Sequence, residues 1–215
     1  MRPHMKLVLG LLAFSTASFG QILNLGVPDA FQVNYAANTN AAPSNDNTFA
    51  ESFINITNTG ASILPDPVPG TICVNIYTFD PSAELLSCCA CAVTPNGLAS
   101  LGVDSSLLNN SLTGQKPSSA VIKLIATEDS GTCDPTSVTA AQLAPGMRAW
   151  RTTPHVLTQT PITFGLTETE FTQAQLSAGE LAHLTTFCSF ITANGTGAGI
   201  CKGCTMGALG AVSSQ

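Results

Sequence analysis

Cysteines are the residues of this sequence whose type and spacing best suit chemistry. Cys88, Cys89 and Cys91 stand within four residues of one another. Thiolates bind zinc or iron–sulfur clusters, exchange disulfides in redox enzymes, or pair into structural disulfides. Which of these applies depends on the spacing of the partners and on the compartment. The other members of the set of eight are Cys73, Cys133, Cys188, Cys201 and Cys204.

The spacing gives little support to metal or redox chemistry. Cys201 and Cys204 form the one C-x₂-C pair without a further cysteine inside it, and a tetrahedral thiolate site needs two such pairs. This pair follows a glycine-rich stretch, whereas thioredoxin-like motifs open a helix within a βαβ unit. The residue after Cys204 is Thr205, so the histidine of c-type haem attachment is missing. We therefore expect no metal, no cofactor and four structural disulfides.

The first twenty residues place the cysteines in an oxidising compartment. Arg2 and Lys6 give a positive start, residues 7–14 are apolar, and residues 15–20 are small up to a cleavage point before Gln21. This three-part pattern is typical of a secretory signal peptide. The prediction is a protein that is secreted or held at the cell surface, where disulfides form and persist.

Charge and hydropathy exclude several kinds of partner. Removal of the signal peptide leaves five basic residues against 13 acidic ones, and charged residues make up only 9% of the chain. An acidic surface without a basic cluster does not bind nucleic acid. No apolar stretch reaches the length of a membrane span. The partners that we expect are further copies of this chain or other surface proteins.

No catalytic constellation is visible in the sequence. The mature chain has two histidines, His155 and His183, and neither a G-x-S-x-G nor an H-E-x-x-H motif. Glu168 and Glu170 share one face of an expected strand, and such a pair suits a glycosidase. Two glutamates on a solvated strand face are the commoner arrangement. We assign no catalytic residue and expect a protein without enzymatic activity.

One group of residues has the composition of a ligand-binding patch. Arg148, Trp150 and Arg151 surround the only tryptophan of the chain, and they suit a sugar or a protein partner. The alternative, which we favour, is a tryptophan that anchors the core with an arginine stacked on it.

The elements that must position these residues are mostly strands. Short runs rich in β-branched and aromatic residues alternate with turn signals, which predicts a mainly β fold, an Ig-like or related antiparallel β-sandwich. The expected strands are residues 31–35, 49–57, 71–80, 84–93, 98–103, 120–127, 147–152 and 162–166.

One helix is expected near the end of the chain. Ser177 and Glu180 have the spacing of a capping box. The apolar residues that follow recur at helical spacing and predict a helix over residues 178–194. The chain then divides into a signal peptide (1–20), a β-sandwich domain (21–166), and a C-terminal strand, helix and Gly/Cys-rich loop packed on the sandwich (167–215).

Strand alternation separates the clustered cysteines. Residues 71–80 and 84–93 predict a hairpin, in which Cys89 and Cys91 share a face and Cys88 points to the other. Cys73 is expected to bond to Cys89 or Cys91 if the hairpin register brings them together. The remaining cysteines of the cluster would then reach the loop of Cys133 or the Cys201–Cys204 region, which is also a candidate partner region for Cys188. Eight cysteines allow 105 pairings, so the connectivity stays open.

Four segments carry a resemblance to a known group. Residues 70–80 (GTICVNIYTFD), 88–91 (CCAC), 94–96 (TPN) and 200–201 (IC) resemble those of secreted, cysteine-containing acidobacterial proteins. The resemblance spans most of the mature chain and implies structural cysteines and turns, but no activity.

The function that we expect is therefore an exported, non-enzymatic structural, adhesion or surface-interaction protein stabilised by disulfides. Two alternatives stay open: an extracellular module that binds a glycan or other small ligand, and a secreted hydrolase or thiol oxidoreductase.

Overall fold

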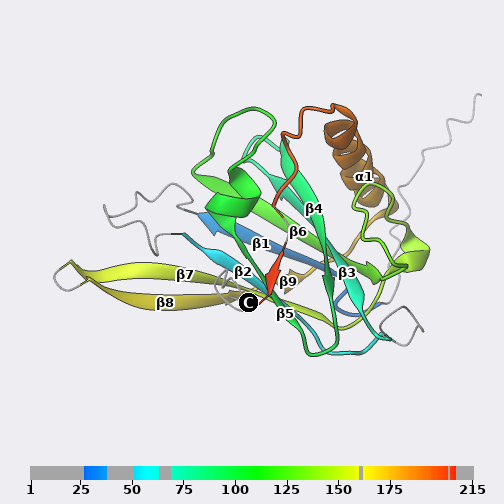
Figure 1. The fold of residues 1–215 in the computed structure, drawn as a ribbon, viewed down its shortest axis with the longest axis horizontal. Helices are drawn as coiled ribbons and strands as arrows, with labels where there is room; N and C mark the ends of the chain where they lie inside the picture. The colour runs from blue at the N-terminus through cyan, green and yellow to red at the C-terminus, as the bar shows by residue number, and fades with distance from the viewer. Residues whose placement is uncertain (1–26, 38–50, 63–68, 160–161, 203, 207–215) are drawn as a thin grey trace, which may run out of the picture.

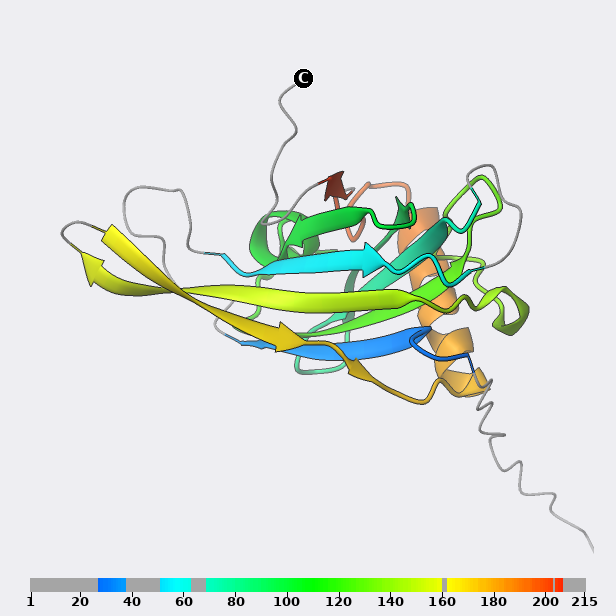
Figure 2. The same ribbon diagram turned by 90° about the horizontal axis from the view of Figure 1, so that it is seen from below.

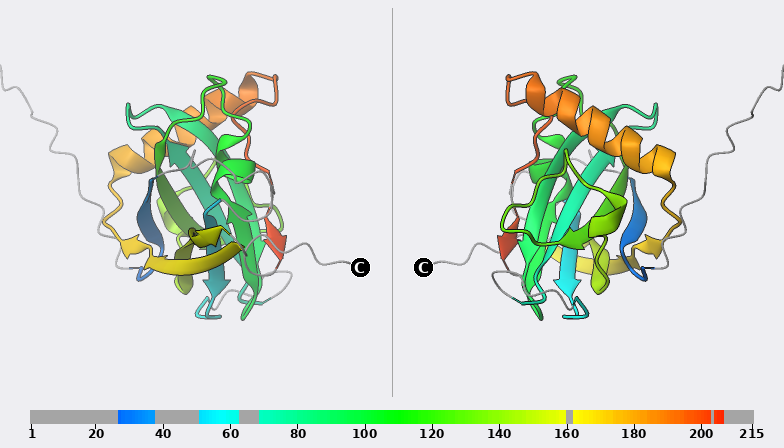
Figure 3. Two further views of the ribbon diagram at one scale, coloured as in Figure 1. Left: turned by 90° about the vertical axis from the view of Figure 1, so that its left-hand side faces the viewer. Right: turned by 90° about the vertical axis from the view of Figure 1, so that its right-hand side faces the viewer.

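The computed structural model describes residues 27–37, 51–62, 69–159, 162–202 and 204–206. Two antiparallel five-stranded sheets pack face to face, and one helix lies across the outer face of the first sheet (Figures 1 and 3). This arrangement confirms the predicted disulfide-stapled β-sandwich with one C-terminal helix. The predicted signal peptide, residues 1–20, lies outside the described residues.

The two sheets have strand orders that place distant segments side by side. Sheet A has the order β4-β3-β6-β1-β9, and sheet B the order β10-β5-β2-β7-β8. The strands of sheet A are β1 (Phe31–Ala37), β3 (Ile72–Phe79), β4 (Leu85–Val93), β6 (Ser119–Glu128) and β9 (Thr172–Gln173). The strands of sheet B are β2 (Phe53–Asn58), β5 (Leu98–Gly102), β7 (Met147–Gln159), β8 (Ile162–Glu170) and β10 (Thr205–Met206).

The main core lies between the sheets. Alternate residues of each strand point inward, as the pleat of a strand requires. Ile72, Val74 and Ile76 on β3 face Ile54 and Ile56 on β2, and all five are fully buried.

A second core lies between sheet A and the helix α1 (Ala178–Ala193). Tyr77 and Phe79 on β3 contribute from the sheet, and Leu184 and Ile191 contribute from the helix. Because strand β3 is covered on both faces, all eight of its residues are buried. The predicted helix is confirmed, and the side chain of Ser177 caps it by accepting a hydrogen bond from the Glu180 amide at 3.0 Å.

The chain crosses from sheet B to sheet A three times, between β2 and β3, between β5 and β6, and between β8 and β9, and the last of these crossings is a tight corner. Strand β8 ends at Glu170, Phe171 is buried at the bend, and the next two residues form β9 against β1 (Figure 2). The Phe171 amide donates to the Ala149 carbonyl of sheet B at 2.9 Å, and the Ala174 amide donates to the Phe31 carbonyl of sheet A at 3.0 Å. This corner closes one side of the sandwich.

Strands β7 and β8 extend beyond the sandwich as a two-stranded hairpin (Figures 1 and 2). Strand β2 pairs with β7 only as far as the Phe53–Thr152 pair, and from Thr153 onward β7 pairs with β8 alone. We call residues 153–159 and 162–167 the arm. The sequence predicted that this strand ends at residue 152, and this prediction is wrong because β7 continues to Gln159. Pro154 fits within β7 because β2 has already ended there, so its missing N–H breaks no ladder on that side.

Among the described residues, no helix is long and apolar enough to cross a bilayer.

Candidate functional site

All eight cysteines are paired. The Cα atoms of the partners lie at distances typical of disulfides. The four bonds, with Cα–Cα distances, are Cys73–Cys133 (5.3 Å), Cys88–Cys188 (5.9 Å), Cys89–Cys201 (5.4 Å) and Cys91–Cys204 (5.6 Å).

The predicted split of the cluster between the two faces of β4 is confirmed. Cys88 faces the helix and bonds to Cys188 on α1, whereas Cys89 and Cys91 face the sandwich core and bond to the C-terminal segment. The four residues 88–91 therefore join β4 to the helix on one side and to the end of the described chain on the other.

The expected bond between Cys73 and Cys89 or Cys91 is wrong. In the hairpin register Cys73 lies opposite Ala92, so it shares the face of Cys88 rather than that of Cys89. Its partner is Cys133 in the loop after β6. The suggested pairing of Cys188 with Cys201 or Cys204 is wrong as well, because those two cysteines bond to the opposite face of β4.

These bonds remove the thiolates that metal or redox chemistry needs. Cys201 and Cys204 are each bonded to β4 and not to each other. Asp129 lies beside the Cys73–Cys133 pair, and the three ligand atoms fall within 4.8 Å of one another. Both sulfurs of that group are already joined in a disulfide, so neither offers a thiolate for coordination.

The predicted ligand patch is divided by the sheet. Arg148 and Trp150 point to the outer face of sheet B, and Arg151 points inward. The Arg151 guanidinium donates from Nε to Asn34 Oδ1 on sheet A at 3.0 Å. Burial lowers the pKa of Arg151. The expected core position of Trp150 is wrong, because Met147 and Ala149 occupy the core and Trp150 is partly exposed.

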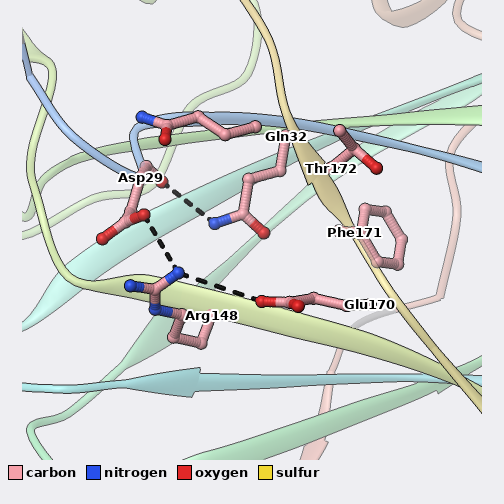
Figure 4. A pocket seen from close by; sticks show the side chains of 7 residues that line it. Asp29, Gln32, Arg148, Glu170, Phe171 and Thr172 are labelled. Carbon is pink, nitrogen blue, oxygen red and sulfur yellow. Dashed lines mark hydrogen bonds and ion pairs between the residues drawn. The ribbon is translucent and has the colours of Figure 1, made fainter.

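Arg148 lines a small pocket at the β8–β9 corner (Figure 4). The pocket has a volume of about 230 Å³. Its walls come from the turn before β1, from β1 itself, from the start of β7 and from the β8–β9 corner. The lining residues are Asp29, Gln32, Arg148, Glu170, Phe171, Thr172 and Gln173.

Two carboxylates flank the guanidinium in this pocket. Arg148 Nη1 lies 3.2 Å from Asp29 Oδ1 and 3.9 Å from Glu170 Oε1. The Arg148 side chain is 44% exposed and that of Asp29 only 17%, so the pair sits at the pocket mouth with the aspartate on the buried side. One guanidinium against two carboxylates leaves the pocket lining with one net negative charge.

A buried glutamine completes the inner wall. Gln32 is 2% exposed, and its Nε2 donates to the Met147 carbonyl at 2.8 Å and to the Asp29 carbonyl at 3.3 Å. Both donor positions are therefore directed at carbonyls. The amide oxygen points into the pocket, toward Phe171 (Figure 4).

Sequence reasoning found only part of this pocket. Arg148 belonged to the predicted patch, and Glu170 to the predicted carboxylate pair. Its other member, Glu168, accepts a hydrogen bond from Thr152 and does not line the pocket. Asp29 and Gln32 carry no spacing signal, because they reach the site only through the pairing of β1 with β9.

The two histidines of the described chain lie on different elements. His155 on the arm shares a hydrogen bond with Thr167 at 2.9 Å. His183 on α1 lies 4.0 Å from Glu180 and packs edge-on against Phe187. Neither contact is the base–nucleophile pair with a third orienting group that covalent hydrolysis requires.

Comparison of the chain with protein-family models, with curated proteins and with solved structures finds no match.

Proposed function

We propose that this is an exported, non-enzymatic surface-interaction protein, and that its contact element is the arm. The observation that carries the proposal is the projection of the arm from a body held by four disulfides. A rigid body with a protruding hairpin suits a protein that engages another molecule outside the cell.

The arm carries apolar surface that its own fold does not cover. Leu157 is 67% exposed and Leu166 is 59% exposed. A two-stranded hairpin without further support is only marginally stable in water. A partner that covers these leucines would bury apolar surface and would also hold the hairpin in place.

The free side of the arm supports pairing with a further strand. In sheet B, β8 has β7 on one side and no described strand on the other. Natural edge strands are usually protected by lysines or prolines, which block the addition of another chain. Residues 162–167 (ITFGLT) contain neither. Strand addition at such an edge is a known mode of protein recognition.

The charge pattern favours a second copy of this chain as the partner. From Thr152 to Thr167 the chain has no Asp, Glu, Lys or Arg, and Glu168 and Glu170 follow only at the base of the arm. Antiparallel pairing of two β8 strands centred on Gly165 would place each Glu168 opposite Ile162 of the other copy. Like charges would stay apart, and a twofold interface is the commonest form of homo-oligomer.

Sedimentation velocity of the mature protein over a range of concentrations tests this proposal. We expect a concentration-dependent dimer. The double variant Leu157→Lys/Leu166→Lys should be monomeric, whereas Phe190→Lys should still dimerise. Phe190 is a matched control, because it is 64% exposed on α1, away from the arm.

A shortened arm gives an independent variant. Thr153 and Thr167 are directly paired, so replacement of residues 154–166 by Asn-Gly joins them through a two-residue hairpin turn. This variant should fold and remain monomeric. A wild-type protein that is monomeric at all concentrations, or arm variants that dimerise like the wild type, would contradict the proposal.

Export is the second part of the proposal and has its own test. It is supported by the leader-like residues 1–20 and by the four disulfides. Expression with the native leader in a bacterial host should yield periplasmic or secreted protein whose intact mass begins at Gln21. Unprocessed protein in the cytoplasm would contradict export.

A further inference from the structure

We infer that the pocket at the β8–β9 corner binds a neutral polyol, a single sugar ring or the end of a glycan chain. The inference is independent of the arm, since it rests on the groups that line the pocket.

The Gln32 side chain presents a hydrogen-bond acceptor to the pocket. Its amide nitrogen is directed at two carbonyls, so a reversed amide would place oxygen against oxygen, and the observed orientation is fixed. The oxygen therefore faces the pocket (Figure 4). A hydroxyl group of a ligand can donate to this oxygen in place of water, and such a hydrogen bond typically contributes about 1 kcal/mol.

Hydrogen-bond donors accompany this acceptor in the pocket. Arg148 contacts both carboxylates through the same nitrogen, Nη1, and the other N–H groups of its guanidinium have no partner among the described residues. Gln173 is paired with Gln32 and adds an amide on the same face of sheet A. The pocket is thus lined by both donors and acceptors. A hydroxyl both donates and accepts, so a polyol matches such a wall.

The charges of the lining residues favour a neutral ligand. An anionic ligand would meet Asp29 and Glu170, and a cationic ligand would have to compete with Arg148 for them. A neutral ligand leaves these ion pairs intact. The volume of about 230 Å³ is below the 300–1,000 Å³ that drug-sized ligands occupy, so one ring fits better than a longer chain.

Saturation-transfer NMR on the mature protein tests the inference, with methyl glycosides of glucose, galactose, mannose and N-acetylglucosamine as probes. At least one glycoside should receive saturation, with a dissociation constant on the order of 1 mM. Acetate and spermidine are the charged comparisons. No transfer to any glycoside, or transfer only to spermidine, would overturn the inference.

Matched variants locate the binding. Arg148→Met should weaken it about tenfold, which is the loss of about 1.4 kcal/mol of hydrogen bonding. Gln173→Leu and Glu170→Gln are surface changes at the pocket and should each weaken it severalfold. Glu168→Gln is the control, because it lies on the same strand face two residues away and does not line the pocket.

Unchanged binding in Arg148→Met and Gln173→Leu would overturn the assignment of the site. Leu157→Lys/Leu166→Lys should bind the glycoside like the wild type, whereas Gln173→Leu should still dimerise. The two proposals therefore fail separately.

Discussion

Cys88 on β4 and Cys188 on α1 are joined by a disulfide although 100 residues separate them in the sequence. Both side chains are buried, and their bond lies within the core between sheet A and the helix. The next residue, Cys89, points to the opposite face and bonds to Cys201. Adjacent cysteines therefore hold β4 to two segments on its two sides.

The first prediction concerns the stability that this bond contributes. The Cys89–Cys201 bond closes a loop whose ends are 112 residues apart. With that bond in place, the Cys88–Cys188 bond closes a further loop of only roughly 15 residues, which is worth about 3 kcal/mol in the chain-entropy model. The double variant Cys88→Ala/Cys188→Ala should lose about that much unfolding free energy in guanidinium titrations. Amide hydrogen exchange should accelerate across residues 178–193.

Cys73→Ala/Cys133→Ala is the control for that experiment. No other disulfide shortens its loop, whose ends are 60 residues apart, so its removal should cost about 4 kcal/mol. Exchange in α1 should change little relative to the rest of the protein. Equal acceleration of α1 exchange in both variants would show that the helix is not held by Cys188.

The second prediction concerns the connectivity of Cys133. Lys123 and Arg148 bound a tryptic peptide that contains this single cysteine. In the non-reduced wild type the peptide should stay attached to the fragment that carries Cys73. In Cys73→Ala it should be released without reduction, as mass spectrometry would detect. Release of the same peptide from Cys91→Ala instead would contradict the pairing.

The third prediction contrasts the two arginines of β7. Arg151 points inward and donates to Asn34 across the gap between the sheets, so Arg151→Met should cost about 2 kcal/mol of unfolding free energy. Arg148 is on the outer face, and Arg148→Met should cost no more than about 1 kcal/mol. Chemical denaturation of both variants measures the difference. Equal losses of unfolding free energy in the two variants would mean that the Arg151–Asn34 hydrogen bond between the sheets does not stabilise the fold.

The fourth prediction concerns alkaline pH. Tyr77 is fully buried, and its hydroxyl donates to the Pro135 carbonyl at 2.6 Å. Burial, and then the negative charge of Asp134, raise the pKa of Tyr77 well above its ordinary value. The folded state therefore keeps the proton when the unfolded chain releases it. The contribution of Tyr77 to stability is complete below pH about 10 and falls by about 1.4 kcal/mol per pH unit above it.

Tyr77→Phe tests this linkage. The variant should be about 1 kcal/mol less stable than the wild type near neutral pH, since the hydrogen bond to Pro135 is lost. The difference should shrink between pH 10 and 11, because phenylalanine has no proton to release. Parallel stability curves for the two proteins over this range would show that Tyr77 does not control the alkaline transition.

Local patterns in the sequence determined the class of the fold. Alternation on residues 72–79 specified which side chains face each core, and the spacing of Ser177 and Glu180 specified where the helix begins. Both signals depend on neighbours within a few residues, so both can be read directly from the sequence. The same alternation divided Cys88 from Cys89, and the structure confirmed it.

Only the tertiary structure decided which distant groups meet. Hairpin register placed Cys73 opposite Ala92. Strand β2 pairs with β7 only as far as Thr152, so the arm projects beyond it. The corner at Phe171 brought Arg148 and Glu170 beside Gln32. Register and strand order depend on contacts between residues far apart in the chain, and the period-two pattern of a strand is the same whichever neighbour it has.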